Sequence, residues 1–310
     1  MTRLIFPLVD RMLLITNAVA GSTGPESVDL ALAVLRESAE VAVAETASLD
    51  QLDGVLERRD GRTVVVAGGD GSLHAVVAAL QRRSELDQPT IGLIPLGTGN
   101  DFARCVQIPL DPARAARVVA GGRTDRIDIL VDDDGGVVVN AVHAGAGADA
   151  AREARRWKKR LGRLGYGVGA VIAGFKVQGE KLHVLGDQQV LANGTRRVLQ
   201  VGVGNGSYIG GGTALTPAAD PTDGQVDLMV SFAVSRKDRL QYAIHLKRGT
   251  HADRHDVHTA RASVVEIHGR DFWCNTDGEL SGPMRRQRWK VRPQAFTMLL
   301  PTHEQAEPSA

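Results

Sequence analysis

Short apolar segments alternate with helix-like segments over the first 125 residues, and this alternation limits the possible folds more than any other feature of the chain. Short apolar runs predict buried strands, whereas apolar residues spaced three and four apart predict amphipathic helices. A chain that alternates the two builds a mostly parallel, doubly wound sheet with helices on both faces. The predicted strands are 12–16, 41–44, 63–67 and 90–94, and the predicted helices are 28–37, 49–58, 73–82, 101–105 and 112–120.

The pattern changes after Gly121 and Gly122 to short segments rich in valine and leucine. Helical patterns interrupt them only at 150–176 and 236–246, which predicts a mostly antiparallel β-sandwich. The predicted strands are 126–131, 137–144, 181–185, 197–204, 226–232, 262–268, 272–275 and 296–300. The predicted division is an α/β domain over 1–125 that 296–303 can complete, a β-rich domain over 126–295 and a frayed tail over 304–310.

Composition excludes several classes of protein. The 310 residues suffice for two domains, and 37 basic against 36 acidic residues give no general attraction to nucleic acid. Cys105 and Cys274 suggest neither a disulfide framework nor a zinc site, which favours a reducing cytoplasm. No uninterrupted apolar segment reaches the roughly 18 residues of a membrane span. We therefore expect a cytoplasmic protein whose contact with any membrane is peripheral.

A glycine turn, Gly68–Ser72 (GGDGS), follows the predicted strand 63–67 and precedes a predicted helix. Glycines let the backbone approach a bulky anion, and free N–H groups at the start of a helix favour negative charge. Asp70 would repel a bare phosphate, so we expect it to act through a bound Mg²⁺ or a hydroxyl group. An ordinary turn is the alternative, although the flanking strand and helix favour phosphate binding.

A second glycine turn lies about thirty residues further along, in Ile94–Arg104 (IPLGTGNDFAR). Gly97 and Gly99 flank Thr98, whose hydroxyl can reach a phosphate or a nucleoside. Asn100 and the aspartate after it can cap the following helix, and a purely capping role is the alternative. Because neighbouring parallel strands end at the same edge of a sheet, the two turns predict a clamp for a nucleoside triphosphate.

Two further segments are expected at the same edge. Asn17–Ser22, which includes Gly21, follows the first predicted strand, at the place for a phosphate or base contact. An ordinary loop explains this segment equally well. Thr46 ends the second predicted strand and can face the same crevice.

The β-rich part contains two acidic turns. Asp220 and Asp223 precede the predicted strand 226–232 and can hold a hard cation through carboxylate and carbonyl oxygens, although a simple Asp-Gly turn is an equal alternative. Asp277 and Glu279 lie in a tight turn after a predicted strand. One carboxylate can act as a general base on a hydroxyl while the other holds a metal or orients it. Out of context, such a turn is more often a solvated hairpin.

Dense glycine and dense positive charge mark two other segments. Gly202–Gly212 (GVGNGSYIGGG) predicts a backbone that packs closely on another group. Arg152–Arg163 holds seven cationic residues within twelve positions, with Trp157 and Leu161 interleaved. Each basic residue near anionic lipid contributes about 1 kcal/mol, so this run is a candidate for peripheral membrane contact. A solvated helix face is the alternative.

Together these motifs resemble the diacylglycerol kinase catalytic family, and most closely the soluble bacterial lipid kinases. The resemblance spans almost the whole chain in the family's order. GTGNDFA is its specific part, because GGDG alone is shared with NAD kinases and phosphofructokinases. It is carried by GGDGSLHAVV at 68–77, IPLGTGNDFAR at 94–104, GNGSYIGGG at 204–212, PAADPTDGQVDL at 217–228 and TDGE at 276–279.

The resemblance implies an N-terminal α/β domain like those of NAD kinase and phosphofructokinase, and a C-terminal β-sandwich, with the active site between them. It also implies ATP- and Mg²⁺-dependent phosphorylation of a lipid hydroxyl, most simply diacylglycerol to phosphatidic acid, and relatives suggest a homodimer. The β-rich domain would then bind the lipid substrate. One departure is that relatives usually carry Asn-Pro in the first loop, where this chain has Asn17-Ala18.

Individual residues carry over from the family's motifs. Those implied to bind ATP are Asn17, Gly21, Thr46, Gly68, Gly69, Asp70, Gly71, Ser72 and Thr98, and the second turn adds Gly97, Gly99 and Asn100. The implied structural Mg²⁺ loop uses Asp223, with Asp220 and Gln225 acting through their backbone carbonyls. Glu279 would accept the proton with Asp277 beside it, while Asp70 would organise the catalytic Mg²⁺.

Three other functions fit parts of the sequence. They are a kinase for a sphingoid base, a kinase for a soluble substrate such as NAD or a sugar phosphate, and a nucleotide-binding regulator without activity. The valine-rich second domain and the lipid-type second loop argue against a soluble substrate. The presence of Asp70, Asp277 and Glu279 argues against a regulator that has lost catalysis.

Overall fold

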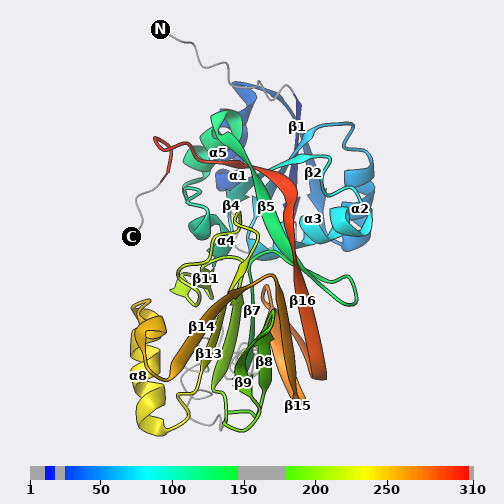
Figure 1. Cartoon of the computed structure of the whole chain (residues 1–310). Coiled ribbons are helices and arrows are strands. Elements are labelled where there is room, and N and C mark those ends of the chain that lie inside the picture. Colours follow the sequence, from blue (N-terminus) through cyan, green and yellow to red (C-terminus); the bar gives the residue numbers. More distant parts are fainter. Residues whose placement is uncertain (1–10, 18–24, 146–178, 307–310) are drawn as a thin grey trace, which may run out of the picture. The chain divides into compact units, whose positions relative to one another are not determined.

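The computed structural model describes residues 11–17, 25–145 and 179–306 (Figure 1). Its contacts divide the chain into unit 1, which comprises Met1–Ile129 and Pro293–Ala310, and unit 2, which comprises Leu130–Arg292. Gly21, the predicted helix 150–176 and the basic run Arg152–Arg163 lie outside the described residues. Within the described ranges, the structure holds no helix whose length and apolar character would suit a bilayer crossing.

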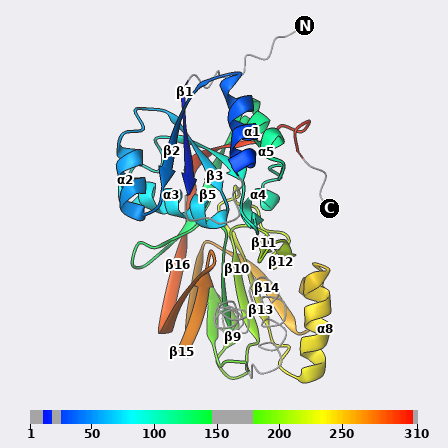
Figure 2. The same cartoon turned by 180° about the vertical axis from the view of Figure 1, so that it is seen from behind.

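Unit 1 confirms the prediction of a doubly wound α/β fold. Its strand order is β2-β1-β3-β4-β16, and every neighbouring pair in that order is parallel. Helices α1 and α5 pack together on one face of the sheet, and α2 packs with α3 on the other (Figures 1 and 2). The strands are β1 (Arg11–Asn17), β2 (Glu40–Thr46), β3 (Thr63–Gly68), β4 (Thr90–Pro95) and β5 (Arg123–Asp132), and the helices are α1 (Pro25–Arg36), α2 (Leu49–Glu57), α3 (Asp70–Arg82), α4 (Asp101–Cys105) and α5 (Pro112–Gly121).

Burial on both faces explains why the strands of unit 1 read as apolar runs. Val64, Val65, Val66 and Ala67 of β3 are all at most 1% exposed. Parallel strands covered by helices on both sides have no face left for polar side chains, so alternation disappears. Helix α3 begins at Asp70, three residues before the apolar pattern that predicted it.

Unit 2 is a β-sandwich whose two layers share the strand β15. One layer runs β14-β13-β10-β7 and continues into the C-terminal part of β15, and the other pairs β9 with β8 and β8 with the N-terminal part of β15. The strands are β6 (Val137–Val138), β7 (Ala141–Gly145), β8 (His183–Gly186), β9 (Gln189–Asn193), β10 (Gln200–Gly204), β11 (Tyr208–Ile209), β12 (Thr213–Ala214), β13 (Val226–Ser231), β14 (Val257–Ala262), β15 (Val264–Thr276) and β16 (Glu279–Leu300).

Two apolar clusters stabilise unit 2. The larger lies between the layers, and Val184, Val203 and Leu228 are among its fully buried members. The smaller packs Leu199, Leu215 and Met229 against Tyr242 of the helix α8 (Arg236–Lys247). The short 3-10 helix η2 (His251–Asp253) follows α8. The helix α8 is therefore attached to the sheet by one side only.

Four strand predictions need correction. The predicted strand 137–144 is divided into β6 and β7, because the backbone N–H groups of Val139 and Asn140 donate to a side chain rather than to a neighbouring strand. The predicted strands 262–268 and 272–275 are both parts of β15, apart from residues 262–263. The last predicted strand, 296–300, is the end of a 22-residue strand. Its middle part is mostly polar and gave no apolar signal.

Candidate active site

The carboxyl ends of β1 to β4 lie at one edge of the unit 1 sheet. Asn17 is opposite Thr46 across β1 and β2, and Gly68 is opposite Pro95 across β3 and β4. In open α/β sheets this is the edge at which ligands bind. The structure thus brings to one edge the described segments that the sequence assigned to a nucleotide.

The two glycine turns touch each other at this edge. A Cβ atom added to Gly97 would lie 2.5 Å from the Cα atom of Gly69, and one added to Gly69 would lie 2.9 Å from the Cα atom of Gly97. The Leu96 N–H also donates to the Gly68 carbonyl at 3.0 Å. The glycines therefore serve the contact between the turns, in addition to any contact with a ligand.

Replacing Gly97 with Ala is expected to lower the unfolding free energy of unit 1 by about 1–3 kcal/mol, because the new methyl group overlaps the Gly69 backbone. Urea unfolding followed by circular dichroism would measure the change. Gly121→Ala is the matched control, since a Cβ atom there meets nothing within 4 Å. Equal stability of the two variants would show that the turns can separate without cost.

The Asp70 carboxylate ties the first turn to the helix after the second. Its two oxygens accept the backbone N–H groups of Asp101 and Phe102, both at 3.0 Å. These N–H groups belong to the start of α4, which has no partner for them within the helix. Asp70 therefore caps α4 from a position about thirty residues earlier in the chain.

The prediction that Asn100 caps α4 with its side chain is wrong. Asn100 does stand at the N-cap position, in a left-handed conformation with φ of 53°, but its side chain makes no capping hydrogen bond. Its amide donates to the Gly97 carbonyl and its Oδ1 accepts the Gly97 N–H, both at 2.9 Å. Asn100 closes the second turn on itself, which leaves the cap to Asp70.

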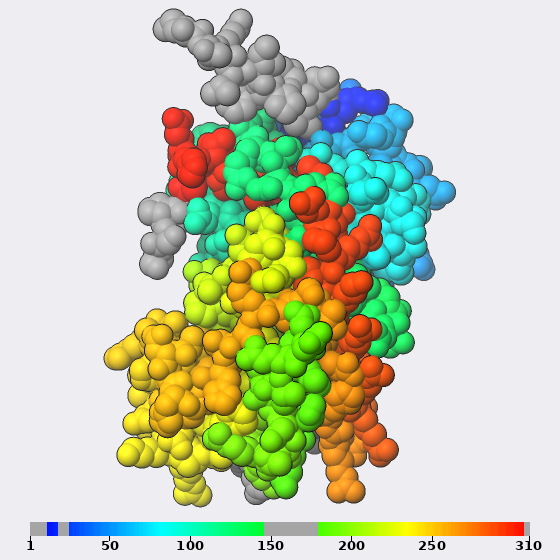
Figure 3. Space-filling view, in the orientation of Figure 1, coloured from blue at the N-terminus to red at the C-terminus, as the bar shows by residue number. Residues whose placement is uncertain are grey.

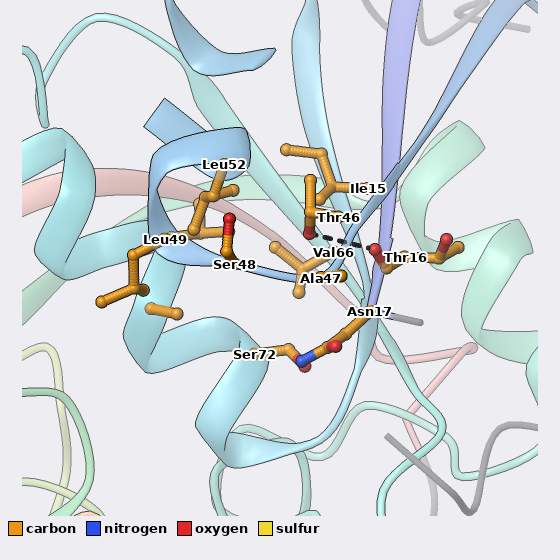
Figure 4. A pocket seen from close by; sticks show the side chains of 12 residues that line it. Ile15, Thr16, Asn17, Thr46, Ala47, Ser48, Leu49, Leu52, Val66 and Ser72 are labelled. Carbon is orange, nitrogen blue, oxygen red and sulfur yellow. Dashed lines mark hydrogen bonds between the residues drawn. The ribbon is translucent and has the colours of Figure 1, made fainter. Parts of the chain in front are cut away.

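A cavity of about 290 Å³ lies beside these turns (Figure 4). Its apolar wall includes Ile15, Leu52 and Val66, and the Thr46 hydroxyl donates to the Thr16 carbonyl at 3.2 Å. The other lining residues are Asn17, Ala47, Ser48, Leu49, Ser72, Ala75 and Val76. Three residues predicted to contact a nucleotide, Asn17, Thr46 and Ser72, therefore share one cavity.

In unit 2 the Asp277 carboxylate anchors the turn that carries Glu279. One Asp277 oxygen accepts the Val139 N–H at 2.7 Å, and the other accepts those of Asn140 and Ala141 at 3.0 and 2.9 Å. Asp277 and Gly278 both have positive φ, as the two central residues of a type I′ hairpin turn require. The turn is thus fixed by its backbone and by three hydrogen bonds.

Glu279 begins β16 directly after this turn, where its pairing partner is Thr276 of β15. Its side chain is exposed and makes no hydrogen bond or ion pair with the described part of the chain. Of the two acidic side chains in the turn, Asp277 is held by backbone donors and Glu279 is open to a second molecule.

Asp277→Asn is expected to lower the unfolding free energy of unit 2 by about 1.5–3 kcal/mol, because the amide group turns a donor toward a backbone N–H. Asn tolerates the positive φ of this position, so the substitution isolates the hydrogen bonds from backbone strain. All three tryptophans lie between residues 130 and 292, so urea unfolding followed by tryptophan fluorescence reports on unit 2. An unchanged unfolding midpoint would contradict the anchoring role.

The acidic loop at 220–225 already has a cationic partner. Asp223 accepts the Gln225 N–H at 3.0 Å with one oxygen and bonds the Arg261 guanidinium with the other. Burial raises the pKa of the neighbouring Asp227. The charge of Arg261 lowers this pKa in part, and the charge of Asp223 raises it further. A carboxylate and two backbone carbonyls are the donors that a hard cation prefers. The loop therefore fits Mg²⁺ in its donor chemistry, with Arg261 as the group that competes for Asp223.

Buried polar residues make contacts that the sequence analysis did not predict. Asn205 is fully buried, donates from its side chain to the Val139 carbonyl at 2.7 Å, and directs its backbone N–H to the Asn140 carbonyl at 2.9 Å. The glycines beside it pack closely on other groups, as predicted, because Cβ atoms added to Gly202 and Gly204 would overlap the side chains of Leu215 and Thr216. Asp128 of β5 is also fully buried and accepts the Gln294 N–H at 2.6 Å. Neither Asn140 nor Asp128 belongs to a motif, so only the fold could reveal them.

Comparisons with known proteins match both halves of the chain. Residues 11–131 match the diacylglycerol kinase catalytic domain, and residues 140–300 match the YegS C-terminal NAD kinase beta sandwich-like domain. Together with the doubly wound unit and its glycine turns, these matches define a kinase. The chain belongs to the family of YegS-like lipid kinases with a diacylglycerol kinase catalytic domain.

Individual relatives agree with this assignment. A YegS-like probable lipid kinase from Pectobacterium atrosepticum is 31% identical over 242 residues, which cover 77% of this chain and 78% of that protein. A diacylglycerol kinase from Mycobacterium tuberculosis is 31% identical over 247 residues, 77% of each protein. A diacylglycerol kinase crystal structure from Bacillus anthracis has the same fold, with a TM-score of 0.72, 23% identity and coverage of 94% of this chain and 97% of that one.

Proposed function

We propose that this kinase transfers the γ-phosphoryl group of ATP to a lipid hydroxyl group, with diacylglycerol as the acceptor and phosphatidic acid as the product. The observation that carries the proposal is the meeting of two glycine turns and a lined cavity at one edge of unit 1, in a chain of the YegS-like lipid kinase family. Relatives named lipid kinase and diacylglycerol kinase support the choice of acceptor.

The nucleotide would bind in two parts. The N–H groups of Gly69–Ser72 and of the turn Gly97–Gly99 would hold the triphosphate, because helix starts and successive backbone N–H groups attract anions. A cavity of about 290 Å³ is at the lower limit for small-molecule sites, so it suits the base rather than the whole nucleotide. Its apolar wall and the polar groups of Thr46 and Asn17 are what a purine requires.

The acceptor hydroxyl would lose its proton to Glu279. Its exposed carboxylate, without a partner among the described residues, supports this role, and general-base help contributes about 10²–10⁴-fold in rate. Asp277 would hold the turn in place through its three backbone hydrogen bonds. We propose that these unit 2 residues and the unit 1 turns serve one reaction.

Mg²⁺ neutralises charge on the phosphates when it is bound. Asp70 is the acidic side chain of the first glycine turn, and the hydrogen bonds from the start of α4 fix the position of its carboxylate. We propose that Asp70 holds the catalytic ion, directly or through water. A second ion would be held by Asp223 with the carbonyls of Asp220 and Gln225.

Transfer of labelled phosphate from ATP tests the proposal directly. The purified protein would be incubated with dispersed diacylglycerol, a sphingoid base or NAD, each with magnesium or with a chelator. We expect labelled phosphatidic acid only when diacylglycerol and magnesium are both present. Labelled sphingoid base or NAD would identify a different acceptor, and no transfer to any of the three would contradict the proposal.

A further inference from the structure

The helix α8 has an outward face that does not pack against the apolar clusters of unit 2. Its inner side is attached through Tyr242, which is 3% exposed and donates to the Gln200 side chain at 3.1 Å. Leu246 packs partly against the same cluster. The side chains on the opposite side of the helix are exposed, and the surface of this segment is visible in yellow (Figure 3).

Two large apolar side chains lie in the middle of this outward face. Leu240 is 58% exposed and Ile244 is 44% exposed, and they are four residues apart, so they adjoin each other on the helix surface. Single exposed apolar residues are ordinary on protein surfaces. A pair at the centre of one exposed helix face is a different feature, because it forms a continuous apolar strip.

Positive charge surrounds that strip. The exposed basic residues of the segment are Arg236, Lys237, Lys247 and Arg248. With four-residue spacing, Arg236 and Arg248 continue the line of Leu240 and Ile244 at its two ends. None of the four basic side chains forms an ion pair with any described residue. The acidic residue of the helix, Asp238, accepts the Ser235 hydroxyl with its carboxylate, and its own backbone N–H donates to the Ser235 oxygen at the helix start.

We propose that the outward face of α8 docks on the surface of an anionic phospholipid bilayer. Leu240 and Ile244 would enter the boundary between headgroups and acyl chains, while the four basic residues would pair with lipid phosphates. Apolar side chains buried at the bilayer surface and basic side chains near anionic lipid each add to the affinity of a peripheral protein. This inference rests on the proposed lipid substrate, and it assigns the surface by which the kinase would reach that substrate.

Sedimentation with vesicles that contain neither diacylglycerol nor ATP tests docking without any catalysis. The full chain is expected to bind mixed phosphatidylglycerol and phosphatidylcholine vesicles and to lose this binding at high salt. The double variant L240D/I244D is expected to bind these vesicles at least on the order of tenfold more weakly than the unaltered protein. It should fold normally, because neither side chain belongs to the apolar clusters of unit 2.

Leu30→Asp is the matched control. Leu30 on α1 is 57% exposed, close to the value for Leu240, but it stands next to Asp29 and outside any group of basic residues. The control should bind vesicles like the unaltered protein. A separate charge variant, K237E/K247E, should lose binding to anionic vesicles even though it retains the apolar strip.

Two results would overturn the proposal. One is equal binding of the unaltered protein and L240D/I244D to anionic vesicles, which would place the contact elsewhere on the chain. The other is failure of the unaltered protein to prefer anionic vesicles, either because it binds pure phosphatidylcholine vesicles equally well or because it binds no vesicle. In the second case an acidic protein would remain as the occupant of this face.

Kinase assays separate a failure of docking from a failure of the proposed function. With diacylglycerol dispersed in a nonionic detergent, L240D/I244D should match the unaltered protein, and in anionic vesicles it should be on the order of tenfold slower. Loss of activity in both media would contradict a pure docking role. Absence of activity in the unaltered protein, with vesicle binding intact, would contradict the proposed function and leave the docking surface standing.

Discussion

Glu279→Gln is expected to lower kcat for phosphate transfer by about 10²–10⁴-fold, since the amide cannot accept a proton from the lipid hydroxyl. The fold should be unaffected, because the Glu279 side chain is exposed and makes no hydrogen bond or ion pair with the described residues. Steady-state assays with labelled ATP would give kcat, and tryptophan fluorescence would confirm the unchanged unfolding midpoint.

An exposed glutamate away from the site provides the control. Glu37, just after α1, is exposed and far from the turn in sequence, so Glu37→Gln should leave kcat unchanged. If Glu279→Gln keeps a normal kcat, the base is another group, and Asp277 becomes the next candidate despite its three backbone bonds.

Asp70→Asn is expected to lower kcat by about 10²–10³-fold, the range found when one preorganised electrostatic group is removed from an active site. The asparagine carbonyl can still accept one N–H of α4, so the loss of stability should stay within about 0.5–2 kcal/mol. Comparison of kcat with the urea unfolding midpoint distinguishes the two effects.

Asp111→Asn is the matched control for this experiment. Asp111 caps α5 by accepting the Arg114 N–H at 2.8 Å, so it makes the same kind of bond but does not belong to either glycine turn. If Asp70→Asn and Asp111→Asn behave alike, with small changes in stability and normal kcat, Asp70 is only a helix cap and holds no catalytic ion.

The framework of unit 1 could be predicted because its signals are local. Buried parallel strands give apolar runs, and Gly68 to Ser72 mark the passage from β3 into α3 within a few residues. The position of Asn17 opposite Thr46 then follows from parallel pairing alone. These parts of the candidate site needed no information from distant segments.

Contacts between distant segments could not be predicted. Asp70 reads as an isolated acid in a turn, and its bonds to Asp101 and Phe102 arise only once β3 and β4 lie side by side. The bond between Arg261 and Asp223 likewise depends on the pairing of β13 with β14. The 22-residue length of β16 escaped prediction because most side chains before Ala295 are exposed and form no apolar pattern.

The unit 1 sheet contains a strand from near the end of the chain, so the sheet can be completed only late in synthesis. The segment after Pro293 supplies the part of β16 that pairs with β4 through Thr297 and Met298. A ribosome would therefore release the whole of unit 2 before the last strand of the unit 1 sheet emerged. Until then the outer edge of β4 would stay unpaired, and an open strand edge invites association with other chains. Completion of the unit 1 sheet must await the final part of translation.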